Sequence, residues 1–95
     1  MTYSLNITQE AKEKIIQVFL WYEQKREGLG SRFVFEVDAM FNYIKAYPYH
    51  FQVKYKNFRE AVLKVFPYVI VYGIIQNEVV VYIVFPTKDN PTKKP

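Results

Sequence analysis

Hydrophobic and polar positions follow two different periods on either side of Pro48. Before Pro48, apolar residues recur at helical spacing in two stretches. The first set is Ala11, Ile15, Val18, Phe19 and Tyr22, and the second is Phe33, Val37, Met40, Phe41 and Ile44. Thr8 is placed to cap the first helix, and Pro48 ends the second. The link "GLGS" is short, so the pattern predicts an antiparallel helix hairpin.

The remaining segments have the signature of strands. "YSLNI" predicts a short strand before the helices, and "FQVKYKN" predicts a short strand and a turn after them. "FREAVLKV" alternates, which is the period of a strand. One side of this strand carries Phe58, Glu60, Val62 and Lys64. The other side carries Arg59, Ala61, Leu63 and Val65.

The most apolar stretch, "VFPYVIVYGIIQNEVVVYIVF", runs from Val65 to Phe85. Its length suits a membrane span, which needs about 20 apolar residues. However, "QNE" lies at its centre, and one acidic residue there costs about 2.5–3.5 kcal/mol on insertion scales. Val, Ile and Tyr favour strands, and Asn77 suits a tight turn. We therefore expect no membrane segment but a β-hairpin with arms Tyr68–Ile75 and Glu78–Phe85.

These elements give the order β-αα-ββββ in an α+β protein. We expect an antiparallel twisted sheet with an antiparallel helix hairpin packed on one face. Residues 1–95 are expected to form a single domain, with 87–95 as a short irregular tail because it combines prolines, charges and turn formers.

One helix layer covers one face of a sheet, so the other face should be polar. Both arms of the hairpin are instead apolar on both sides. We expect an apolar surface that a second chain covers, because large exposed apolar patches are typical of binding sites. Strict alternation places on it Val69, Val71, Tyr82 and Val84.

Composition and charge narrow the function. The chain has 95 residues, 51% of them hydrophobic, with no Cys and a net charge of +4. Bases and acids cancel in residues 1–47, so the excess lies in the second half. Arg59, Lys64, Lys88, Lys93 and Lys94 are the candidate basic contacts. Ordinary solvated charge is the plainer interpretation.

Candidates for catalysis are scarce. His50 is the single His, and no Ser-His-acid set is evident around Ser4 or Ser31. Metal-ligand spacing and a glycine-rich phosphate loop are absent from the sequence. We therefore expect no cofactor, no metal and no self-contained active site. The N-terminus lacks the pattern of a signal peptide, which favours a cytoplasmic location.

The segments "WYEQKREGLGSRFVFEV", "FREAVLKVFPYVIVYGI" and "VVVYIVFPTKDNPTKKP" resemble the ParE/RelE toxin superfamily of type II toxin–antitoxin systems. The resemblance spans nearly the whole chain and implies the fold expected above. It also implies a cognate antitoxin, in a complex whose oligomeric state, homodimer or toxin–antitoxin hetero-oligomer, is open.

Two branches of the superfamily differ in target. The ParE-like (plasmid stabilisation) branch, which the "FPYVIVY" and "GLGSRF" segments resemble more closely, implies inhibition of DNA gyrase. The RelE-like alternative implies a ribosome-dependent endonuclease acting on messenger RNA, and a non-toxic antitoxin-binding member is a third interpretation. The basic positions of RelE-like members are occupied here by Glu60, Val62, Val69 and Asp89, while Pro86 replaces a His. These replacements disfavour the nuclease.

Overall fold

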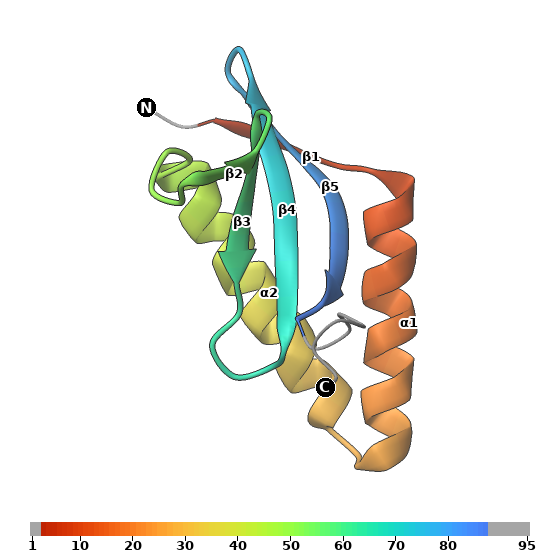
Figure 1. Cartoon of the computed structure of the whole chain (residues 1–95). Coiled ribbons are helices and arrows are strands. Elements are labelled where there is room, and N and C mark those ends of the chain that lie inside the picture. The colour runs from red at the N-terminus through yellow and green to blue at the C-terminus, as the bar shows by residue number, and fades with distance from the viewer. Residues whose placement is uncertain (1–2, 88–95) are drawn as a thin grey trace.

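A computed structural model describes residues 3–87 and shows the predicted order of elements (Figure 1). The elements are β1 (Ser4–Ile7), α1 (Gln9–Lys25), α2 (Leu29–Ala46), β2 (Val53–Tyr55), β3 (Phe58–Val62), β4 (Tyr68–Ile75) and β5 (Glu78–Pro86). The predicted hairpin arms agree with β4 and β5 to within one residue. The turn between them contains Asn77, as expected, and its positive φ lies at Gln76, at 57°.

The five strands form one sheet in the order β1-β5-β4-β3-β2. The β2–β3, β3–β4 and β4–β5 pairs are antiparallel, as expected. The β1–β5 pair is parallel, which corrects the all-antiparallel expectation. The reason is that the helix hairpin carries the chain across to the far edge of the sheet. β1 therefore pairs with the last strand and not with a neighbour in sequence.

Thr8 joins the start of α1 to the sheet. Its hydroxyl oxygen accepts a hydrogen bond from the backbone N–H of Ala11 at 3.1 Å, which caps the helix as predicted. The same hydroxyl donates to the carbonyl of Tyr82 at 2.9 Å. One side chain therefore fixes both where α1 begins and where it lies relative to β5.

The turn between the helices depends on two glycines and one carboxylate. Gly28 has a φ of +88°, a left-handed conformation that most side chains disfavour. The Glu23 carboxylate accepts hydrogen bonds from the backbone N–H groups of Gly28 and Gly30, both at 2.8 Å. A Cβ on Gly30 would collide with the carbonyl oxygen of Phe19. Close approach of the helices thus requires glycine at this point.

The core lies between the helix hairpin and one face of the sheet, where Figure 1 shows both helices. Both helical sets predicted from the sequence face it except for Phe19, which lies against Gly30. Its buried members are Ala11, Val18, Phe33, Val37, Phe41, Ile44, Ala61, Leu63, Phe66, Ile70, Tyr72, Val79, Val81 and Val84. Within residues 3–87, no helix is long and apolar enough to cross a membrane.

Candidate functional site

The face of the sheet turned away from the helices is apolar across its three central strands. In β4, Ile70 and Tyr72 belong to the core, so Val69 and Val71 point to the opposite face. Strand pairing aligns Val69 with Phe85 and with Val62. We call this surface the open face. It comprises Phe58, Glu60, Val62, Val69, Val71, Val80, Tyr82, Ile83 and Phe85.

Exposure varies across the open face. Val62 is 53% exposed, whereas Val69 is 4% exposed although it lies outside the core cluster. The centre of the face is therefore less accessible than its β3 side. Val71, Ile83 and Phe85 are half-buried. The apolar layer is continuous, with Glu60 as its acidic member.

The pairing register between β4 and β5 shifts at Tyr82. Val71 pairs with Ile83 and Tyr72 pairs with Val81, so Tyr82 is an extra residue in β5, a β-bulge. Beyond the bulge the alternation is reversed. Val84 consequently faces the helices and is 1% exposed. The expectation that Val84 shares a face with Val69 and Val71 is therefore wrong, because strict alternation cannot anticipate a bulge.

The ring of Tyr82 covers a glycine on the open face. A Cβ on Gly73 would lie 3.1 Å from the Cε2 atom of Tyr82. The ring also packs edge-on against Phe58, with centroids 5.2 Å apart. Absence of a side chain at Gly73 leaves room for this aromatic pair, which closes one end of the open face.

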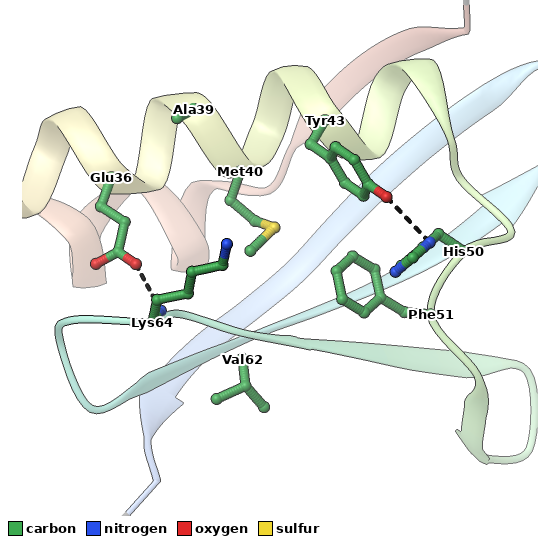
Figure 2. Close-up of a pocket in the computed structure, with 8 residues that line it drawn as sticks. All are labelled: Glu36, Ala39, Met40, Tyr43, His50, Phe51, Val62 and Lys64. Carbon is green, nitrogen blue, oxygen red and sulfur yellow. Dashed lines mark hydrogen bonds between the residues drawn. The ribbon is translucent and has the colours of Figure 1, made fainter.

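A groove lies beside the open face, between α2 and the segment that joins β3 to β4. Two adjoining hollows of about 410 and 430 Å³ share Glu36, Ala39 and Lys64. Figure 2 shows the first hollow, where the side chains of Met40, Phe51 and Lys64 face the space between α2 and β3, while that of Val62, at the border of the hollow, points to the other side of β3. Val62 is thus common to the groove and the open face.

Glu36 holds the wall of the groove together. Its carboxylate accepts hydrogen bonds from the backbone N–H groups of Lys64, Val65 and Phe66. The Phe66 N–H lies 3.2 Å from Oε1, and the Val65 N–H lies 3.1 Å from Oε2. These hydrogen bonds satisfy the carboxylate of Glu36, which would otherwise face the groove without partners. No sequence motif signals this contact, because the partners are about 30 residues apart.

The single histidine, His50, lies at the end of the groove next to Tyr43. The Tyr43 hydroxyl and His50 Nδ1 are 3.0 Å apart at the end of the groove (Figure 2). Among residues 3–87, no group of three or more His, Cys, Asp or Glu side chains is placed to hold a metal ion.

The predicted basic contacts lie in different places. Arg59 is half-buried on the helix side of β3, where Nη1 donates to the carbonyl of Phe51 at 2.6 Å. Its guanidinium lies 5.0 Å from the centroid of the Tyr49 ring. Lys64 lines the groove. Lys88, Asp89, Lys93 and Lys94 lie outside the described residues.

Tyr72 anchors the segment between α2 and β2 from inside the core. Its buried hydroxyl donates to the carbonyl of Pro48 at 2.7 Å. Burial raises the pKa of Tyr72 to about 12, while nearby Arg59 opposes the shift. At neutral pH the hydroxyl is therefore protonated and able to donate this hydrogen bond.

Comparison with solved structures finds a close match in fold. A chain from the structure of the chromosomal ParDE toxin–antitoxin system of P. aeruginosa superimposes with a TM-score of 0.82. The two chains share one fold. The match covers 92% of this chain and 98% of the other, at 11% sequence identity. Comparison with protein-family models and with curated proteins finds no match. The ParE/RelE-like fold expected from the sequence is confirmed.

Proposed function

We propose that this chain is the toxin component of a type II toxin–antitoxin system and that an antitoxin segment covers its open face. The observation that carries the proposal is the apolar open face in a chain with the fold of a ParDE chain. The apolar side chains of this face, with Val62 at 53% exposure, favour association with another polypeptide. An antitoxin that neutralises a toxin needs a surface of the toxin on which to bind, and the open face would be that surface.

The test uses a pair of matched substitutions. Val62 and Val53 are both exposed strand valines, at 53% and 46%, but Val53 lies on the edge strand β2, away from the open face. We expect Val62→Asp to weaken the complex with the protein encoded by the adjacent reading frame at least tenfold. Val53→Asp should leave affinity unchanged. Calorimetry on purified proteins measures both, and equal affinity for the two variants would contradict the assignment of the open face.

The target of the free toxin is a separate part of the proposal. The sequence resemblance favours DNA gyrase, and the cytoplasm would be the site of action. Expression of the chain without its partner should arrest growth and relax plasmid DNA. Cleavage of messenger RNA on ribosomes, without loss of supercoiling, would instead support the RelE-like alternative. Growth without arrest would support the non-toxic antitoxin-binding member.

The tail lysines test the contact with the target. Replacing Lys88, Lys93 and Lys94 by Ala should weaken toxicity if the tail contacts the target through its charges, and the fold should be unaffected. Antitoxin binding serves as the folding control. Full toxicity of the triple variant would exclude the tail from the mechanism.

A further inference from the structure

Glu60 is the charged member of the open face, and its neighbours there are apolar. Val71 lies directly opposite it in the β3–β4 pairing. Phe58 and Val62 lie two residues before and after it, on the same side of β3. Opposite side chains on one sheet face have Cβ atoms about 4.5–5.5 Å apart, so Glu60 and Val71 are within reach of each other. The carboxylate therefore emerges from within an apolar surface.

The side chain of Glu60 has no partner within residues 3–87. This part of the chain forms no hydrogen bond or ion pair to its carboxylate. Glu23 and Glu36 are half-buried like Glu60, but both accept hydrogen bonds from backbone N–H groups. Arg59, the adjacent base in sequence, points to the helix side and donates to the carbonyl of Phe51. Among residues 3–87, therefore, nothing offsets the charge of Glu60, and solvent stabilises it.

Covering the open face removes this solvent from Glu60. A carboxylate that leaves water without a counter-charge or hydrogen bonds carries a large free-energy cost. A cation placed against it offsets much of that cost, and Lys and Arg are the side chains that supply one. A covering segment with apolar side chains only would leave Glu60 desolvated and unpaired.

We infer that the segment covering the open face carries a Lys or Arg that pairs with Glu60, flanked by apolar side chains that pack on Val62 and Val71. The inference rests on the proposed function and names the chemistry of the antitoxin at this point. The pair also fixes how the segment lies, because a shift along the face would place its base on valines and leave Glu60 alone. Glu60 is then a specificity-determining residue, which disfavours an antitoxin without a base at this position.

A second copy of this chain fits the open face less well. Two open faces packed about a two-fold axis would present the same residues to each other. Two Glu60 carboxylates would then enter one apolar layer, where like charges repel. The unpartnered acid therefore favours a basic partner over self-association.

The test is the sign of the change in affinity when Glu60 loses its charge. Calorimetry measures binding of the purified full chain to the protein encoded by the adjacent reading frame. Glu60→Gln keeps the size of the side chain and should weaken binding at least about tenfold, because the base of the antitoxin is then buried without a counter-charge. If the cover had no base, the same substitution would remove a desolvation cost and tighten binding. Asp38→Asn removes an equal charge from the exposed side of α2 and should leave affinity unchanged.

A charge swap identifies the base. Each Lys and Arg of the protein from the adjacent reading frame is changed to Glu in turn. One of these variants should bind the wild-type chain at least about tenfold more weakly and regain that affinity with Glu60→Lys. Circular dichroism verifies that each variant is folded.

Three results would overturn the inference. The first is binding by Glu60→Gln that is as tight as that of the wild type or tighter. The second is a weakening that no charge swap restores, which would assign a neutral donor to the carboxylate. The third is loss of the Glu60→Gln effect after Lys88, Lys93 and Lys94 are replaced by Ala, which would place the base in the chain's own tail.

Val62→Asp separates this inference from the proposed function. If Val62→Asp weakens the complex and Glu60→Gln does not, the antitoxin covers the open face without a base, and the proposed function stands. If neither substitution changes the affinity, the open face is not the antitoxin site, and the proposed function falls together with the inference.

Discussion

Glu36 provides the sharpest test of how the groove is built. Its carboxylate accepts hydrogen bonds from three successive backbone N–H groups, those of Lys64, Val65 and Phe66. Substitution Glu36→Gln keeps the size of the side chain but replaces one acceptor oxygen with an NH₂ donor. Whichever way the amide is oriented, at least one backbone N–H loses its acceptor.

The expected cost follows from the exposure of the donors. Lys64 and Val65 are exposed, with Val65 at 67%, so water can replace a lost hydrogen bond there. Phe66 is 6% exposed, and an orphaned buried N–H costs about 1–3 kcal/mol. The amide keeps the hydrogen bonds to its oxygen but loses their charge assistance. The amide can turn its oxygen to the Phe66 N–H and leave the loss to the exposed donors, so we expect Glu36→Gln to lower the free energy of unfolding by about 1–2 kcal/mol.

Two measurements distinguish a local from a general effect. Urea denaturation gives the change in unfolding free energy, and hydrogen exchange gives the protection of the amides of residues 64–66. Asp38→Asn is the matched control because Asp38 is an exposed acid on the same helix. It should change stability by less than about 0.5 kcal/mol.

Unaltered exchange at all three amides of residues 64–66 in Glu36→Gln would refute the reasoning, because the three hydrogen bonds would then contribute nothing to local stability. Equal destabilisation by Asp38→Asn would refute it in another way. It would attribute the effect to the net charge of α2 and not to the three hydrogen bonds.

Three further predictions concern the fold. Tyr72→Phe should cost about 1–3 kcal/mol at pH 7 by orphaning the carbonyl of Pro48. The difference in unfolding free energy between wild type and variant should shrink by up to about 2–3 kcal/mol between pH 10 and 12 in urea titrations. The reason is that Tyr72 of the wild type ionises at lower pH in the unfolded state than in the folded state, so the wild type loses stability over this range. A constant difference would contradict the raised pKa. Gly30→Ala should lower stability by about 1–3 kcal/mol in thermal melts, since its Cβ would collide with Phe19; an unchanged melting temperature would contradict the close approach. Arg59→Ala should lower the urea midpoint and speed proteolysis of the α2–β2 segment, and wild-type values for both would show that its hydrogen bond is dispensable.

Local periodicity predicted most of the fold. The apolar spacing of the two helical sets, the capping hydroxyl of Thr8 and the length of "GLGS" predicted α1, α2 and their tight connection. The β4–β5 hairpin followed from strand-forming residues around a polar centre. These features depend on neighbours a few residues apart, and the sequence displays such relations directly.

Tertiary structure decided how distant segments meet. The parallel pairing of β1 with β5 follows from where the helix hairpin delivers the chain. The bulge at Tyr82 turns Val84 into the core, although the pattern gave it to the open face. The capping of residues 64–66 by Glu36 joins positions far apart in sequence. Such contacts depend on packing in three dimensions, and a one-dimensional pattern of polar and apolar residues contains no record of it.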